Sequence, residues 1–243
     1  MQLMWRSAEQ THCGKRRKNN EDAVLSRPDA RLWAVADGMG GHEAGEVASQ
    51  AVADALQDLA LSGMLSEDVD AVEDALVSVN DELRVLARNE GLQSTIGTTV
   101  VALLTTNHVG VVLWAGDSRL YRLRGSSLEQ VTRDHNPVSD LLESGTVTEA
   151  DALAADTNII TRAVGGQSEL YLDIAVFDVG PNDTFLLCSD GLYRELEGPE
   201  LVAELRRDTV DDIVENLLRK CLEGAARDNV SIVVARPEMQ CRN

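Results

Sequence analysis

The sequence predicts an α+β fold of antiparallel sheets with layers of helices outside them. Two observations predict it. Strand-like runs follow one another directly and helical segments come in pairs, whereas a parallel sheet requires strands and helices to alternate. The strand-like runs are also apolar over several consecutive residues, which indicates burial on both faces, between a second sheet and the helices.

Seven runs rich in Val, Ile and Leu are predicted to form strands, because most of them are bounded by Gly, Asn or Asp. Consecutive runs lie close together along the chain, which favours antiparallel pairing. The runs are RLWAVAD (31–37), TTVVALLT (98–105), VGVVLWAGDS (109–118), LYRLR (120–124), LDIAVFDV (172–179), TFLLCSD (184–190) and NVSIVVA (229–235).

Apolar residues spaced by threes and fours predict three helices and a shorter fourth. The first covers about 44–62, with a stripe of Val47, Ala51, Ala55 and Leu59. The second covers about 67–89, with a stripe of Val69, Val72, Leu76, Val79, Leu83 and Leu86. The third, near 209–224, carries Ile213, Leu217, Cys221 and Leu222. A short helix is expected after Pro199, since proline suits the first turn of a helix.

The segment 133–165 is polar and weakly helical between strands, and we expect it to be an insertion that lies over an edge of the fold. A chain of 243 residues suits one large domain or two small ones, with ample material for a buried core. No internal repeat or low-complexity linker divides it. We therefore expect a single domain over residues 1–243.

The composition predicts a globular, cytoplasmic protein. Hydrophobic residues make up 44% of the chain, but no apolar run is long enough to span a bilayer. The N-terminal residues lack the pattern of a secretory signal. The four cysteines have no metal-type spacing and are expected to be ordinary thiols in a reducing compartment: Cys13, Cys188, Cys221 and Cys241.

The charge of the chain is strongly negative, at −19 from 22 basic and 41 acidic residues. Such a field repels nucleic acid and anionic membranes, so neither is an expected partner. It also repels a phosphorylated substrate, unless cations or local arginines reverse the sign of the charge at the site.

Four aspartates fall at the ends of predicted strands: Asp37, Asp117, Asp190 and Asp228. Strands that pack together bring their ends together, so the four carboxylates could meet at one rim. Two unit charges about 4 Å apart repel by roughly 4 kcal/mol at an effective dielectric near 20, and a divalent cation would remove that conflict. Oxygen ligands favour Mg²⁺ or Mn²⁺ over Zn²⁺. The alternative is that each aspartate is a turn or cap residue, and two of the four precede glycine.

The stretch VADGMGGHEAGE (35–46) places three glycines within four residues of Asp37. A flexible loop or a simple Asp-Gly turn would explain this. A metal site would explain it as well, because Gly38 lets the backbone approach an ion and offers its carbonyl oxygen as a ligand. Gly40 and Gly41 would then leave the surface open for a substrate.

The stretch GKRRKNNEDA (14–23) is a basic cluster that runs directly into Glu21 and Asp22. It could be a solvated loop. It could also hold phosphate, because an arginine fork binds two phosphate oxygens at once and the two acids can order metal-bound water.

Taken together, these stretches resemble the metal-dependent serine/threonine protein phosphatases of the PPM (PP2C) type, in their bacterial branch. The matching pieces occur in the order of the family and span nearly the whole chain. They are GKRRKNNEDA, VADGMGGHEAGEVAS, GTTVV (97–101), WAGDSRLYRLR (114–124), TRDH (132–135), ITRAVG (160–165), LLCSDGLY (186–193) and ARDNVSIVV (226–234).

The resemblance implies a four-layer αββα sandwich with two Mn²⁺ or Mg²⁺ ions at one end of the sheets, and with 133–165 as a mobile flap. It implies that Asp37 bridges both ions, that the Gly38 carbonyl binds one of them, and that Asp190 and Asp228 hold the other. Three further acids have weaker implied roles: Glu21 and Asp22 act through metal-bound water, and Asp117 binds a third, weaker metal.

The resemblance also implies the chemistry. A metal-activated water attacks phosphorus in line with the departing Ser or Thr oxygen, and no phosphoenzyme forms. Arg17 matches the phosphate-binding arginine, because it lies three residues after Gly14 and three before Asn20, whereas Arg16 does not match. Arg17 and the metals would stabilise charge on the phosphoryl oxygens.

Two positions depart from the family pattern. His12 stands where many members have Asp, which affects a supporting contact. Met39 stands where eukaryotic members have a histidine that is suspected to be the general acid, and methionine cannot donate a proton. His42 and His135 are candidates for that role by residue type only.

The expected function is therefore hydrolysis of phosphoserine and phosphothreonine in proteins, by a monomer that opposes a eukaryotic-like Ser/Thr kinase. A non-catalytic or regulatory binding module with the same fold is the alternative. An unrelated metal-dependent nuclease is disfavoured, since the chain is acidic and lacks basic stripes.

Overall fold

The computed structural model describes residues 3–40, 44–89, 96–143 and 159–239, and its strands form two antiparallel sheets. The five-stranded sheet has the order β1-β11-β10-β7-β8. Its strands are β1 (Leu3–His12), β11 (Val230–Met239), β10 (Asp183–Cys188), β7 (Arg119–Arg124) and β8 (Ser127–Gln130).

The six-stranded sheet has the order β2-β3-β5-β6-β9, with a short β4 paired to β3. Its strands are β2 (Asp22–Arg27), β3 (Leu32–Met39), β4 (Gly97–Thr98), β5 (Val100–Thr105), β6 (Val109–Ala115) and β9 (Asp173–Asp178). Every strand pair in the described residues is antiparallel, as the grouping of strands along the sequence predicts.

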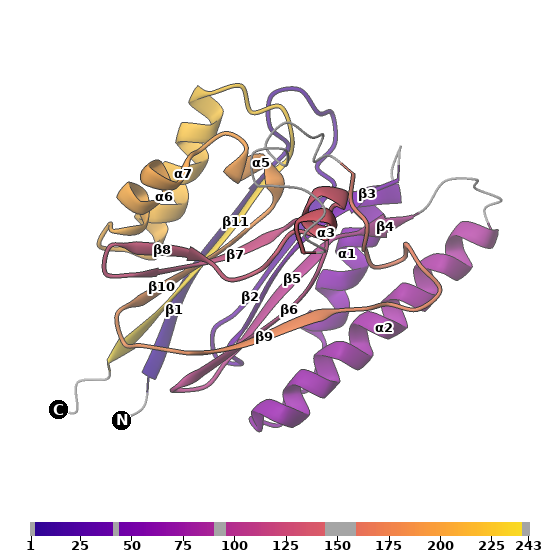
Figure 1. Cartoon of the computed structure of the whole chain (residues 1–243), viewed down its shortest axis with the longest axis horizontal. Coiled ribbons are helices and arrows are strands. Elements are labelled where there is room, and N and C mark those ends of the chain that lie inside the picture. The colour runs from indigo at the N-terminus through magenta and orange to yellow at the C-terminus, as the bar shows by residue number, and fades with distance from the viewer. Residues whose placement is uncertain (1–2, 41–43, 90–95, 144–158, 240–243) are drawn as a thin grey trace.

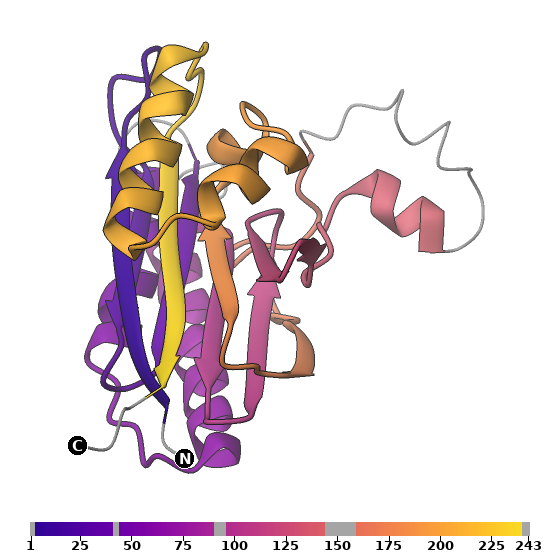
Figure 2. The ribbon, with the colours of Figure 1, turned by 90° about the vertical axis from the view of Figure 1, so that its left-hand side faces the viewer.

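Helices cover the outer face of each sheet (Figure 1). On one side of the paired sheets lie α1 (Ala44–Gln57) and α2 (Leu65–Asn89), and on the other lie α6 (Gly198–Leu205) and α7 (Val210–Glu223). Two shorter helices, α3 (Pro137–Glu143) and α5 (Asp190–Tyr193), occupy connections between strands. Figure 2 shows α3 standing away from the sandwich.

Three apolar clusters separate four layers. One joins α1 and α2 to the six-stranded sheet, and a second joins α6 and α7 to the five-stranded sheet. The third lies between the sheets, where Trp33 and Phe185 are fully buried and the rings of Trp5 and Trp33 are centred 4.9 Å apart. The αββα architecture implied by the resemblance is confirmed.

All seven expected strands are present, with the predicted run 98–105 divided between β4 and β5, and three further strands are not predicted. The unexpected strands are β1, β2 and β8, and each lies at an edge of its sheet. An edge strand has a neighbour on one side only and tolerates polar side chains, so these three show no continuous apolar run. The fourth edge strand, β9, keeps its apolar run although Ile174 and Val176 are exposed. In β1, for example, buried and exposed residues alternate at the start, with Leu3 and Trp5 facing inward.

The predicted stripe on the first helix is confirmed for Ala51, Ala55 and Leu59, which pack against the core, and is wrong for Val47. Val47 is 45% exposed, and the buried face of α1 carries Gly45, Ala48, Val52 and Leu56. The reason is a backbone contact: a Cβ on Gly45 would lie 2.9 Å from the carbonyl carbon of Gly38, so this turn of α1 must face β3. The helix also ends at Gln57, before the predicted boundary.

The other helices follow the predicted pattern. In α2, Val72, Leu76, Val79 and Leu83 are buried, with Val69 and Leu86 packed beside them. The third predicted helix is α7, which begins after Thr209, whose hydroxyl accepts a hydrogen bond from the Asp212 backbone at 3.1 Å. The short helix expected near Pro199 is α6.

The predicted insertion 133–165 lies partly outside the described residues, which omit 144–158. Its described part contains α3 and returns to the six-stranded sheet through an isolated bridge between Thr98 and Val164. Within the described residues, no helix combines the length and the apolar character needed to cross a membrane.

The buried stripe of α2 can be tested with neighbouring substitutions. Leu76 is fully buried, so Leu76→Ala should lower the free energy of unfolding by about 2–5 kcal/mol. Val77 is 39% exposed, so Val77→Ala should change it by less than about 0.5 kcal/mol. Urea unfolding of both variants measures the difference, and equal losses would contradict the assignment of this face to the core.

Candidate metal centre

The ends of both sheets bring acidic side chains from distant parts of the chain to one pocket of about 540 Å³. Asp22 begins β2 and Asp37 lies near the end of β3, where the two residues are paired directly across the strands. Asp190 begins α5 after β10, and Asp228 precedes β11. The lining residues are Arg17, Glu21, Asp37, Gly38, Met39, Gly40, Asp117, Ile160, Asp190, Arg194, Asp228 and Asn229.

The sequence-predicted site residues therefore lie together, with one exception. Arg17, Glu21, Gly38 and the four strand-end aspartates all line the pocket. Asp22 does not line it but is buried, and its Oδ2 accepts a hydrogen bond from the Ser189 hydroxyl at 2.8 Å. Asp22 can thus act on the pocket through its neighbours.

Two glycines set how closely the elements of the site approach. A Cβ on Gly38 would lie 2.0 Å from the Gly45 carbonyl oxygen, so any larger residue would force α1 away from β3. A Cβ on Gly191 would lie 1.9 Å from the Asn229 carbonyl oxygen. Gly38 thus has a packing role in addition to the metal-approach role that the sequence suggested.

The basic loop reaches the pocket through Arg17. Its guanidinium donates to Oδ2 of Asp228 at 2.8 Å, while about half of its side chain remains exposed to solvent. Arg16 is exposed and does not line the pocket. Of the two neighbouring arginines, Arg17 alone can contact a bound anion in this pocket as the loop stands.

Asn229 fastens this loop to the sheet. Its amide NH₂ donates to the carbonyl oxygens of Cys13 and Asn19 at 3.1 and 3.0 Å, and its Oδ1 accepts from the Glu21 backbone at 2.8 Å. From the sequence, Asn229 is predicted only as the start of a strand. The signal that could have found it is its position next to Asp228, in a motif that the chain shares with the family.

Buried hydroxyl groups hold the backbone on which the aspartates stand. The Asp37 backbone N–H donates to the Thr99 hydroxyl at 3.0 Å, and Thr99 in turn shares a hydrogen bond of 2.7 Å with Ser118. Ser118 follows Asp117 in the turn between β6 and β7. This chain of bonds links the positions of Asp37 and Asp117, and the sequence showed no pattern that would have predicted it.

Without bound ions, the pocket disfavours the ionised form of its carboxyl groups. Burial raises the pKa of Asp22 to about 6 and that of Asp190 to about 7, with neighbouring acids adding to the effect. Burial, followed by repulsion from Asp22 and Asp190, raises the pKa of Asp37 well above its ordinary value. A bound cation would reverse this balance, because it stabilises the charged carboxylates.

The donor atoms suit a hard divalent cation. Three buried carboxylate oxygens have no hydrogen-bond partner: Oδ1 of Asp22, Oδ1 of Asp117 and Oδ1 of Asp190. Unpaired buried oxygens are costly, and nearby positive charge, from a bound cation or from a guanidinium of the chain, offsets that cost. Among the described residues, no three His, Cys, Asp or Glu side chains are arranged to hold a metal ion as they stand. Arginines stand between the carboxylates, with Arg17 on Asp228 and Arg194 on Asp190.

The histidines are placed away from the centre of the pocket or are not described. His135 is buried, its Nδ1 accepts from the Gly116 backbone at 3.0 Å, and its Nε2 lies 3.2 Å from Asp173, so it braces the turn before Asp117. His42 lies outside the described residues. Met39 lines the pocket, and His12 accepts a hydrogen bond from the Gly14 backbone at 2.9 Å.

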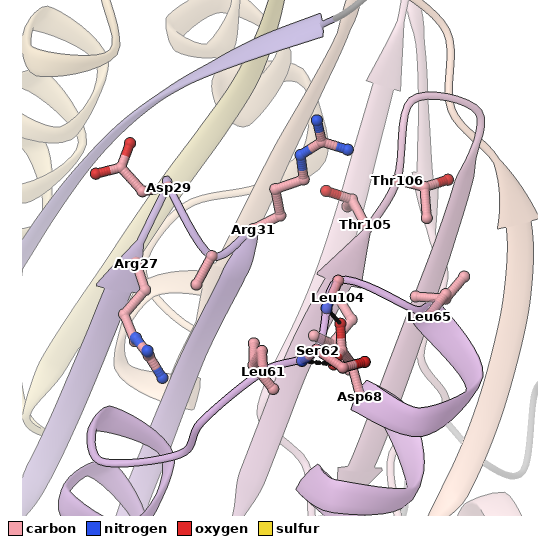
Figure 3. Close-up of a pocket in the computed structure, with 12 residues that line it drawn as sticks. Arg27, Asp29, Arg31, Leu61, Ser62, Leu65, Asp68, Leu104, Thr105 and Thr106 are labelled. Atoms are coloured by element: carbon pink, nitrogen blue, oxygen red, sulfur yellow. Dashed lines mark hydrogen bonds between the residues drawn. The ribbon is translucent and has the colours of Figure 1, made fainter.

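A second pocket, of about 440 Å³, lies at the opposite end of the six-stranded sheet (Figure 3). Its Arg31 precedes β3 and is six residues from Asp37, which is about 20 Å along an extended strand. Asp68 there accepts bonds from the backbones of Ser62 and Gly63, and Arg27 donates to carbonyl oxygens at the end of α1. The Asp68 bonds hold the α1–α2 connection to the first turn of α2, the Arg27 bond joins β2 to α1, and neither contributes to the carboxylate site.

Comparisons with known proteins all indicate one family. A family model described as protein phosphatase 2C matches residues 9–226. The serine/threonine protein phosphatase PstP of Mycobacterium tuberculosis is 37% identical over 238 residues, which cover 96% of this chain and 45% of the length of that relative. The serine/threonine phosphatase stp of Listeria monocytogenes is 31% identical over 238 residues, which cover 94% of each chain.

Solved structures of similar proteins have the same fold. PppA, described as a key regulatory component of T6SS in Pseudomonas aeruginosa, has a TM-score of 0.90 and 40% identity, with 97% of this chain and 99% of that chain covered. The catalytic domain of PstP in complex with two manganese ions has a TM-score of 0.84 and 34% identity, with 98% and 100% covered.

Manganese should stabilise this protein. An ion present at 100 times its dissociation constant adds about 2.7 kcal/mol to the free energy of unfolding, which corresponds to a rise of about 5–10 °C in Tm. Asp37→Asn should remove most of that rise, and the exposed Asp211→Asn should leave it intact. Differential scanning fluorimetry with and without Mn²⁺ measures it.

The same effect should depend on pH. Because the pKa values of Asp22 and Asp190 are raised to about 6 and about 7, protons compete with the ion as the pH falls through this range. The stabilisation by Mn²⁺ should therefore be smaller at pH 5.5 than at pH 8. A rise in Tm that is the same at both values, or absent at both, would contradict the carboxylate centre.

Proposed function

The chain belongs to the protein phosphatase 2C family, and we propose that it hydrolyses phosphoserine and phosphothreonine in proteins at the carboxylate pocket. The observation that carries the proposal is the meeting of Asp37, Asp190 and Asp228 with Arg17 in one pocket. Oxygen donors for cations and a guanidinium for phosphate thus face the same space, as phosphoryl transfer requires.

The carboxylates would hold two divalent ions. Asp37, with the Gly38 carbonyl beside it, faces the pocket from β3, and Asp190 and Asp228 face it from the other sheet. Glu21 and the buried Asp22 would support them from behind. When bound, the ions would lower the pKa of water, and this supplies a nucleophile for attack on phosphorus near neutral pH.

Arg17 would bind and orient the phosphoryl group. Its guanidinium has five donors, of which the structure uses one on Asp228, and its side chain is half exposed at the mouth of the pocket. A planar fork of this kind matches two phosphate oxygens at once. The contact with Asp228 holds the fork toward the carboxylates, so the phosphorus would lie next to them.

The physiological setting extends this proposal. We infer that the substrates are proteins phosphorylated by a Ser/Thr kinase, which this enzyme opposes in the cytoplasm as a monomer. The three described cysteines, Cys13, Cys188 and Cys221, are free thiols, which suits a reducing compartment. A net charge of −19 disfavours self-association.

Asp190→Asn should reduce Mn²⁺-dependent turnover of a phosphothreonine peptide by at least about 100-fold, since even residues that support a metal ligand contribute 10–100-fold. The substitution keeps the shape of the side chain, so circular dichroism should be unchanged. Asp211→Asn, on the exposed face of α7, serves as a control with the same chemical change. Turnover near that of the wild type would show that Asp190 holds no essential ion, and a protein inactive in every form would favour a binding module.

Arg17→Ala should raise KM for a phosphopeptide by about 10-fold or more, because a charge-assisted contact with phosphate is lost. Its effect on kcat should be smaller. The matched control is Arg16→Ala, which removes the same charge from the next residue but not from the pocket. Steady-state kinetics decide between them, and an equal rise in both variants would mean that the loop acts only through its general charge.

A further inference from the structure

Arg194 occupies the space between two of the aspartates. Its guanidinium lies 3.0 Å from Oδ2 of Asp190 and 3.6 Å from Oδ2 of Asp117, and it lines the same pocket as Arg17. A third ion bound to Asp117 is what the resemblance implies at this place. The structure already holds a positive charge there, and that charge belongs to the chain.

The position of Arg194 follows from the local fold. It caps the single turn of α5 that Asp190 begins, and its backbone N–H donates to the Asp190 carbonyl oxygen at 3.0 Å. A spacing of four residues on a helical turn places the two side chains side by side. The guanidinium therefore points back to Asp190 because of the backbone, and its placement does not depend on a long or mobile loop.

The other side of this space is braced as well. The Tyr193 hydroxyl donates to the carbonyl oxygen and to Oδ2 of Asp117, at 3.1 and 3.3 Å. The Arg119 guanidinium lies 3.5 Å above the Tyr193 ring and is fixed by two bonds of 2.9 and 2.7 Å to Asp134. Oδ2 of Asp117 is thus directed toward protein donors, and Tyr193 is held from behind.

The charges around the pocket support the same conclusion. Six carboxylates gather here, and two arginines offset two of them: Glu21, Asp22, Asp37, Asp117, Asp190 and Asp228, with Arg17 and Arg194. Two divalent ions cancel the four negative charges that remain. A third divalent ion would leave the pocket with two surplus positive charges and would have to displace Arg194 from Asp117.

We propose that Arg194 takes the place of a third metal ion beside Asp117, so that this pocket binds two divalent ions. The inference rests on the proposed metal centre and refines it. Arg194 is then a positioning residue: it holds Asp190 and Asp117 at a fixed separation in the absence of an ion between them. Its removal should open a site for a third ion at Asp117.

Counting bound Mn²⁺ tests the inference without reference to activity. Equilibrium dialysis at a fixed free Mn²⁺ concentration, followed by elemental analysis, should give two ions per wild-type chain. Arg194→Ala should give three, with the third weaker than the first two. The double substitution Arg194→Ala with Asp117→Asn should return the count to two, which would locate the added ion at Asp117.

A matched control is Arg227→Ala, which removes the same charge from an exposed residue next to Asp228 and should leave the count at two. Arg194→Gln provides a second variant of similar size should the alanine variant fold poorly. Three ions in the wild-type protein, or two in both Arg194 variants, would overturn the proposed role of Arg194 but not the metal centre. No tightly bound Mn²⁺ in any form would overturn the metal centre itself, and the inference with it.

Discussion

The gathering of like charges where the two sheets end is the constraint on which the rest of this structure depends. Asp22 and Asp37 are paired across neighbouring strands, and Asp190 and Asp228 approach from the other sheet. Two carboxylates about 4 Å apart repel by about 4 kcal/mol at an effective dielectric near 20. A few such pairs rival the whole stability of a domain, about 5–15 kcal/mol. The three apolar clusters provide the rigidity that keeps these groups together.

Positive charge supplied by the chain itself answers part of this repulsion. Arg17 and Arg194 each contact an aspartate of the pocket, within a chain whose net charge is −19. The same guanidinium groups make the site attractive to an anionic substrate, although the remaining surface repels one. Acidity of the protein as a whole and binding of phosphate would be compatible once divalent ions are bound, because two such ions cancel the four negative charges that the two arginines leave in the pocket.

Much of the fold and of the site could be predicted from the sequence. Continuous apolar runs identify strands buried on both faces, as in β5 and β10, because burial leaves no room for polar residues. Acidic residues at the ends of such runs indicated one rim, and Asp37, Asp117, Asp190 and Asp228 do line one pocket. The family could be inferred from the order of short motifs along the chain, because that order is specific even where each motif alone is weak.

The tertiary structure decided what depends on contacts between distant segments. The edge strands β1, β2 and β8 mix polar with apolar residues and so do not stand out as apolar runs, and their pairing becomes visible only beside a neighbour. The face that α1 buries follows from the close approach of Gly45 to Gly38, and this contact cannot be predicted from the spacing of apolar residues in the helix. Asn229 and Arg194 act through contacts with residues far away in sequence. Asn229 accepts a hydrogen bond from the Glu21 backbone, and the Arg194 guanidinium lies near Asp117. Residue types and their order thus determined which groups were available, and packing determined which of them meet.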